Sequence, residues 1–156
     1  MSHDFDQRLA ALGAEVPNPT VPGANYVPAV IVGNIVFLAG QVPRRDNDWI
    51  CLGRHGENLT IEQGVAGARL CALNLIVQLR EACGGSLARV RRIVKLTGFV
   101  NATPDFVDMA KVVNGASDTF IEIFGEAGRH ARSAVGVATL PRGCGVEIEA
   151  IAEIDV

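Results

Sequence analysis

The chain has 156 residues, of which 49% are hydrophobic and 20% charged, and its formal net charge is −3 at neutral pH. This length and this apolar share predict one domain, residues 1–156, with a sizeable core. The acidic balance argues against a nucleic-acid partner, whose surface usually requires a basic excess, and no apolar run approaches the length of a membrane span.

Residues 1–25 predict an N-terminal extension packed on that domain. Residues 4–12 are typical of a short helix, because their apolar side chains share one face and Gly13 follows them. Prolines recur between positions 17 and 28 and favour an extended segment, which carries Tyr26.

Residues 27–43 predict two strands, because apolar side chains alternate on both sides of a turn signal at Gly33 and Asn34. The next stretch, 44–57, is polar and interrupted by glycines. We expect a loop there, with room for one short strand.

A first long helix is predicted from Thr60. Thr60 and Gln63 fit a capping box, and apolar residues recur at spacings of three and four between positions 65 and 82. The apolar stripe is wide, so this helix should be more buried than a typical surface helix. Gly84 and Gly85 are expected to end it.

Residues 91–100 alternate as a strand does, and a second helix is predicted after them. Thr103 suits its N-cap, Pro104 its first position and Gly125 its end. The order of strands, helix, strand, helix and strands predicts one α+β layer structure with both helices on one sheet face.

The candidate functional residues lie late in the chain. Residues 132–139 predict a strand in which Arg132 heads a strip of very small side chains, which leaves room for a ligand beside the guanidinium. A turn around Pro141 follows, and from residue 146 apolar positions alternate with acids such as Glu147. These acids are typical of a solvated sheet face; the alternative is that one of them shares a pocket with Arg132.

The four cysteines and three histidines show no paired metal-ligand spacing, which predicts that there is no metal site. We interpret the cysteines as reduced thiols, with Cys71 and Cys83 as small core residues. Reduced thiols and a start without the apolar region of a signal peptide together predict a cytoplasmic protein.

Three motifs in the chain resemble those of a known family. They are GQVP at 40–43, RSAVGVATLP at 132–141 and VEIEAIA at 146–152. Each motif is weak alone, but their order and the helices between them resemble the reactive intermediate deaminase (Rid) family, also called the YjgF-like or L-PSP endoribonuclease family. The longer segment at 44–58 resembles a longer-chain branch of that family, whose members are mostly uncharacterised.

The resemblance implies a chorismate-mutase-like α+β fold, with a mixed sheet of about six strands and two helices on one face. It also implies a homotrimer with ligand clefts between subunits. The best-known members hydrolyse imines and enamines of small carboxylates to a keto acid and ammonia, without a metal or cofactor. The resemblance therefore implies a small carboxylate-bearing substrate and no cofactor.

The same resemblance assigns roles to individual residues. It implies that Arg132 holds the substrate carboxylate and that Glu147 positions or activates water. Tyr26 and the backbone around Gly40 would lie at the same cleft.

This sequence departs from the best-known members at three positions of the implied site. Their cleft serine falls on Ala39 and their cysteine after the arginine falls on Ala134, so two polar groups are missing from the substrate-binding set. His130 precedes Arg132 and adds positive character, which favours a larger or more anionic ligand.

The chemistry of the residues fits the implied reaction. A guanidinium grips a carboxylate through two parallel hydrogen bonds, and a carboxylate can accept the proton of an attacking water. The structural alternative is an ion pair between Arg132 and Glu147 on adjacent strands. The residues alone favour the structural ion pair over a functional site, whereas the family resemblance favours the functional site.

Two other functions stay open. One is a ribonuclease, although the acidic balance and the lack of a basic groove with aromatics count against it. The other is a non-catalytic trimer that binds a small carboxylate and regulates a partner, which the alanines at 39 and 134 make credible.

Overall fold

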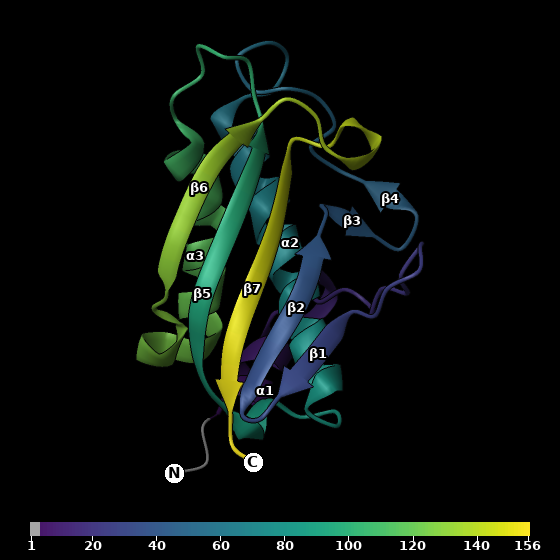
Figure 1. Cartoon of the computed structure of the whole chain (residues 1–156), viewed down its shortest axis with the longest axis vertical. Coiled ribbons are helices and arrows are strands. Elements are labelled where there is room, and N and C mark those ends of the chain that lie inside the picture. Colours follow the sequence, from purple (N-terminus) through teal and green to yellow (C-terminus); the bar gives the residue numbers. More distant parts are fainter. Residues whose placement is uncertain (1–3) are drawn as a thin grey trace.

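A mixed five-stranded sheet with helices on one side forms the body of the protein (Figure 1). The computed structural model describes residues 4–156. The strand order is β1-β2-β7-β5-β6, and only the β5–β6 pair is parallel. The strands of this sheet are β1 (Ala29–Val32), β2 (Ile35–Gln41), β5 (Val90–Asn101), β6 (Ala131–Val137) and β7 (Val146–Ile154). A separate hairpin pairs β3 (Arg44–Arg45) with β4 (Asp48–Trp49).

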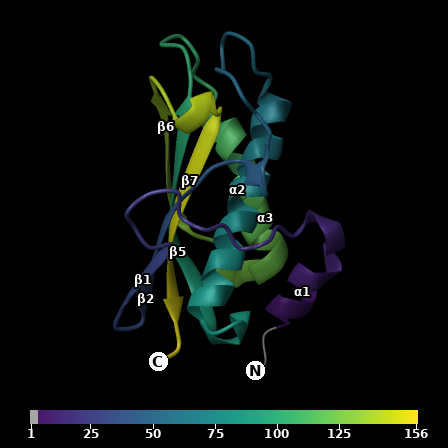
Figure 2. The same ribbon diagram turned by 90° about the vertical axis from the view of Figure 1, so that its right-hand side faces the viewer.

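In the part of the chain that the structure describes, the α-helices are α1 (Phe5–Ala11), α2 (Ile61–Ala82) and α3 (Met109–Phe124), and they lie on the same side of the sheet (Figure 2). The predicted α+β class, with both long helices on one face, is confirmed. The sheet has five strands in the described residues where about six were expected. The segment 44–57, expected as a loop with room for one short strand, begins with two short strands that form the β3–β4 hairpin.

Helix α2 begins as its sequence predicts. The backbone nitrogen of Gln63 donates to Thr60 Oγ1 at 3.2 Å, and the Thr60 nitrogen donates to Gln63 Oε1 at 2.9 Å, which completes the capping box. At the other end, Gly84 and Gly85 have φ angles of +82° and +95°. Glycine adopts this left-handed region without a Cβ penalty, so the helix stops there.

The predicted start of α3 at Thr103 is wrong, because the helix begins at Met109. Long-range backbone bonds hold Thr103 instead. Its nitrogen donates to the His55 carbonyl at 2.9 Å, and the His55 nitrogen donates to the Asn101 carbonyl at 2.9 Å. The chain therefore continues in extended form past β5 and makes a turn before it can become helical.

Two glycines let α3 lie close to its neighbours. A Cβ at Gly115 would overlap the backbone carbonyl of Val65 on α2, and a Cβ at Gly98 on β5 would overlap the Val113 side chain. Helix α2 packs mainly on β2 and β7, and α3 mainly on β5 and β6. The core lies between these layers and includes the fully buried Leu75, Ile93, Leu96, Phe120 and Ile148.

The N-terminal segment contacts both long helices. The ring of Phe5 lies 4.9 Å from that of Phe124 at the end of α3, measured between centroids. Further along, Gln78 on α2 donates from Nε2 to the Thr20 carbonyl at 2.7 Å. Among the described residues, no helix is both long and apolar enough to cross a bilayer.

The opposite face of the sheet carries no helix (Figure 2). Apolar side chains are nevertheless exposed on it: Val30 is 50% exposed, Phe37 46% and Val135 43%. Each alternates along its strand with a residue that faces the helices. The single chain thus leaves apolar side chains of this face open to solvent, beside the glutamates of β7.

Candidate functional site

A cavity of about 650 Å³ opens where β2 ends and β7 begins. Its volume falls within the range of about 300–1,000 Å³ that is typical of small-molecule sites. Four parts of the chain contribute to it: the extended segment before β1, the end of β2, the β3–β4 hairpin and the turn before β7. The lining side chains with polar or aromatic groups are Thr20, Tyr26, Gln41, Arg44, Asn47, Trp49, Arg142 and Glu147.

Glu147 lies in this cavity because of the alternation along β7. Val146 and Ile148 are fully buried toward the helices, so Glu147 points to the opposite face of the sheet. Gly40 lies beside it, where the β2–β7 register shifts between Leu38 and Gln41. A Cβ at Gly40 would overlap the Glu147 carboxylate, so the glycine provides the space that this carboxylate occupies.

The Glu147 carboxylate has no polar partner in the described part of the chain. It makes no hydrogen bond or ion pair within residues 4–156. Burial raises the pKa of the Glu147 carboxyl above its ordinary value, and the charge on Glu149 adds to the rise. Such a group is more basic than an ordinary glutamate, as a general base requires.

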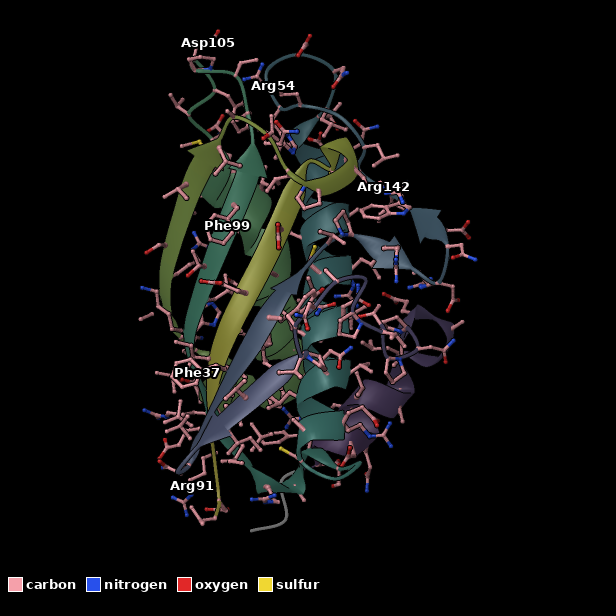
Figure 3. The ribbon with its side chains drawn as sticks, turned by 45° about the vertical axis from the view of Figure 1, so that its right-hand side comes forward. Phe37, Arg54, Arg91, Phe99, Asp105 and Arg142 are labelled. Carbon is pink, nitrogen blue, oxygen red and sulfur yellow. The ribbon has the colours of Figure 1, made fainter. Side chains whose placement is uncertain are left out.

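Two arginines line the same cavity without a carboxylate partner among the described residues. The guanidinium carbon of Arg44 lies 5.9 Å from the centroid of the Trp49 ring, a cation–π contact across the hairpin. Arg142 lies in the short helical turn Pro141–Gly143, and its φ of +59° is in the left-handed region. Figure 3 shows Arg142 at this turn, on the side of the β3–β4 hairpin.

Tyr26 enters the cavity from the extended segment and is 51% exposed. The segment is attached to the sheet by Thr20, whose Oγ1 donates to Gln41 Oε1 at 3.1 Å. The structure thus brings Tyr26, Gly40 and Glu147 to one cavity. The motif resemblance implied that these residues share a cleft.

Arg132 lies elsewhere, at the edge of the sheet next to α3. Its Nη1 donates to Asn114 Oδ1 at 2.8 Å and to Ser117 Oγ at 3.1 Å. His130 continues this network: Nδ1 lies 2.6 Å from the Gly128 carbonyl, so Nδ1 donates and Nε2 accepts from Ser117 at 2.9 Å. Burial lowers the pKa of His130; the Gly128 carbonyl opposes this shift and the charge on Arg132 adds to it.

The expectation that Arg132 shares a pocket with an acid of β7 is wrong within one chain. Arg132 is in register with Leu96 of β5 and faces the helices, whereas Glu147 is in register with Phe99 and faces away from them. The ion pair on adjacent strands is wrong as well, because β5 lies between β6 and β7. One chain therefore presents two separate polar sites.

The other two predicted positions line neither site. Ala39 lies next to the bulge of β2, and Ala134 packs against the core on the helix side of β6. Sequence reasoning missed Arg44, Arg142 and Trp49. All three lie in connections or short strands, where isolated residues form no periodic pattern. The only sequence signal for Arg142 was its place in the turn between two predicted strands.

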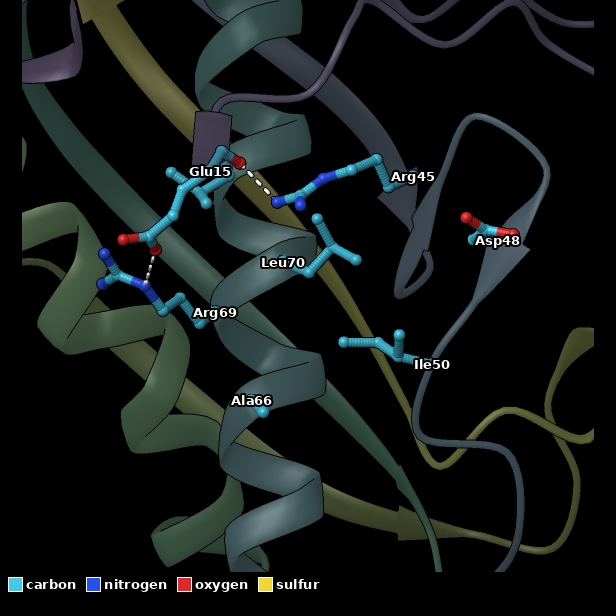
Figure 4. Close-up of a pocket in the computed structure, with 8 residues that line it drawn as sticks. Glu15, Arg45, Asp48, Ile50, Ala66, Arg69 and Leu70 are labelled. Carbon is cyan, nitrogen blue, oxygen red and sulfur yellow. Dashed lines mark hydrogen bonds and ion pairs between the residues drawn. The ribbon is translucent and has the colours of Figure 1, made fainter. Parts of the chain in front are cut away.

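A second cavity, of about 280 Å³, lies between the N-terminal segment, the β3–β4 hairpin and α2 (Figure 4). Its arginines are already engaged by the chain. Arg69 Nε lies 3.0 Å from a Glu15 carboxylate oxygen, and Arg45 Nη2 donates to the Glu15 carbonyl at 2.6 Å. It therefore offers no unpaired guanidinium to an anionic ligand, unlike the Glu147 cavity. Within the described residues, no three His, Cys, Asp or Glu side chains are grouped to hold a metal ion.

The chain is similar to proteins of one family. A family model described as "YjgF/chorismate mutase-like, putative endoribonuclease" matches residues 6–153. Protein TCP17 of Trypanosoma cruzi is 45% identical over 94% of this chain and 92% of its own. The 2-iminobutanoate/2-iminopropanoate deaminase of Escherichia coli is 34% identical over 81% of this chain and 85% of its own.

Solved structures fall into two levels of similarity. A protein of unknown function from Agrobacterium tumefaciens matches with a TM-score of 0.88 and 42% identity, over 99% of this chain and 96% of that one. E. coli TdcF with bound serine matches with a TM-score of 0.60 and 28% identity, over 90% and 95%. The backbone thus resembles the Agrobacterium protein more closely than TdcF.

Proposed function

Because this chain belongs to the YjgF/chorismate mutase-like family, known also as the Rid family, we propose that it hydrolyses the C=N bond of small carboxylate-bearing imino acids. The products are a keto acid and ammonia. The observation that carries the proposal is the Glu147 carboxylate, which has no partner, a raised pKa and a position in a cavity lined by guanidinium groups.

The reaction needs only water and a base. Glu147 accepts a proton from a water molecule as the water oxygen bonds to the imine carbon, and the electron pair of the C=N bond moves to nitrogen. The nitrogen takes up that proton from Glu147. Glu147 then accepts the hydroxyl proton of the tetrahedral intermediate as the carbonyl forms, and the amino group, protonated by solvent, leaves as ammonia. Imines hydrolyse readily in water, so positioning of substrate and water is sufficient for useful acceleration.

The substrate carboxylate needs a cation, and we assign that role to Arg132 of a neighbouring subunit. Within one chain Arg132 and Glu147 lie on opposite sides of the sheet. Arg132 is carried by β6, an edge strand, and the open face of the sheet exposes apolar side chains such as Phe37 and Val135. A homotrimer that covers this face would let the β6 edge of one subunit approach the Glu147 cavity of the next.

The trimer is testable with one surface substitution. We expect light scattering to give about three times the chain mass of 16.5 kDa at micromolar concentration. Phe37→Glu should shift the mass toward the monomer, because it places a charge on the apolar face. The matched control is Val107→Glu, at an 80% exposed valine in the loop before α3. A wild-type monomer, or equal effects of the two substitutions, would contradict the assembly.

The two alternatives give different results in one assay. The protein is offered a freshly generated 2-imino acid and, separately, single-stranded RNA. We expect ammonia release above the uncatalysed rate and no RNA cleavage, because the cavity is small and the chain carries net negative charge. RNA cleavage that depends on Glu147 would favour a ribonuclease. Binding of the keto acid without turnover of the imine would favour a non-catalytic carboxylate sensor.

A further inference from the structure

We propose that Arg142 and Arg44 bind a second anionic group of the substrate, so that the preferred substrate is a 2-imino acid with a carboxylate on its side chain. This inference rests on the proposed function and names its substrate class. It makes Arg142 a specificity-determining residue of the Glu147 cavity.

Charge is the first support. The cavity holds two guanidinium groups and one carboxylate, although the whole chain carries a net charge of −3. Neither Arg44 nor Arg142 forms an ion pair with Glu147 within residues 4–156, so both guanidinium groups stay available to an anionic ligand. With Arg132 added from a neighbour, the site would hold three guanidinium groups and one carboxylate, a net charge of two positive units. A ligand with one carboxylate leaves one positive charge unmatched, whereas a ligand with two carboxylates leaves none.

Space is the second support. A cavity of about 650 Å³ exceeds what a four-carbon imino acid fills. Arg142 precedes Glu147 by five residues across the turn into β7, and Arg44 follows the end of β2 on the other side. A longer substrate can therefore place its imine carbon near Glu147 and a terminal carboxylate near the arginines.

The state of the two arginines is the third support. The guanidinium of Arg44 lies over the Trp49 ring in a cation–π contact, and none of its N–H groups donates to an acceptor within residues 4–156. Arg142 occupies a left-handed backbone position that favours glycine, and its side chain makes no hydrogen bond or ion pair within residues 4–156. The fold therefore gains no side-chain hydrogen bond or ion pair from an arginine there, whereas an anionic ligand would gain one from it.

The test compares two probes of equal carbon number. 2-Oxopentanoate and 2-oxoglutarate differ only in the terminal carboxylate, and both resemble the keto-acid product. We expect calorimetry on the wild-type protein to show at least about 10-fold tighter binding of 2-oxoglutarate. Arg142→Gln should remove most of that preference and leave the affinity for 2-oxopentanoate within about 2-fold.

Arg92→Gln is the control. Arg92 is exposed, has no side-chain partner in the described residues, and lies at the far end of the sheet, next to the Arg91 labelled in Figure 3. It removes the same unit of charge, so we expect it to change neither affinity. Equal binding of the two probes, or an Arg142→Gln effect matched by Arg92→Gln or equal on both probes, would overturn the inference.

Turnover separates this inference from the proposed function. A protein that hydrolyses imino acids with and without a terminal carboxylate equally well would overturn the second anion site and leave the imine hydrolase standing. A protein that prefers 2-oxoglutarate through Arg142, but hydrolyses no imine, would overturn the imine hydrolase and leave the second anion site standing.

Discussion

Glu147→Gln is expected to lower kcat/KM for imine hydrolysis by about 10²- to 10⁴-fold, the range typical of a lost general base. The amide has the size of the carboxylate and fits the space beside Gly40, but it accepts no proton. The wild-type rate should fall as pH is lowered, because protonation disables the base. Since burial raises the pKa of Glu147, that loss should begin above the ordinary value of 4.5.

The stability of the same variant provides its control. A carboxyl whose folded pKa lies above its unfolded pKa destabilises the fold once the pH exceeds the unfolded value, because the unfolded state ionises more easily. At pH 7 Glu147→Gln should therefore melt at the wild-type temperature or above it. A variant that keeps its activity within about 3-fold, or that loses activity by unfolding, contradicts the assignment of the base.

Arg132→Ala is expected to lower kcat/KM about 10- to 100-fold. Hydrogen bonds to charged groups contribute roughly 1.5–3 kcal/mol each, and the substitution removes a guanidinium that would bind the substrate carboxylate. Arg132→Lys should restore little, because an ammonium lacks the planar fork. The melting temperature should fall slightly, since Arg132 also donates to Asn114 and Ser117 on α3.

Asn114→Ala separates the two roles of Arg132. It removes the 2.8 Å contact with the guanidinium but leaves the guanidinium itself. We expect it to share the small loss of stability and to keep turnover within a few-fold of wild type. If Asn114→Ala and Arg132→Ala lower stability alike and neither affects turnover, Arg132 only ties β6 to α3.

Local patterns predicted the elements well where local chemistry decides them. The capping box at Thr60 and the glycines after α2 involve neighbours in sequence, so the helix ends could be predicted. Along β7 the alternation of apolar residues and acids correctly placed Glu147 on the face away from the helices. The start of α3 could not be predicted in this way, because the Thr103 backbone is bound to His55, 48 positions earlier in the sequence.

The candidate site was only partly predictable for the same reason. Motif resemblance brought together Tyr26, Gly40 and Glu147, which line one cavity. It could not show that β5 lies between β6 and β7, because strand order depends on contacts far apart in the chain. Arg142 was missed because a single arginine in a turn forms no periodic pattern. Its proposed role depends on the cavity around it, which segments distant in the sequence form together.

The most direct measurement is the rate of ammonia release from a freshly generated 2-imino acid, with wild-type protein, with Glu147→Gln and without protein. An acidic imino acid with a terminal carboxylate is the substrate of choice. We predict release well above the uncatalysed rate with the wild type, and an enzyme-dependent rate lower by about 10²- to 10⁴-fold with Glu147→Gln at equal concentration. A wild-type protein that leaves the rate of ammonia release unchanged on acidic and neutral imino acids alike would contradict the proposed function.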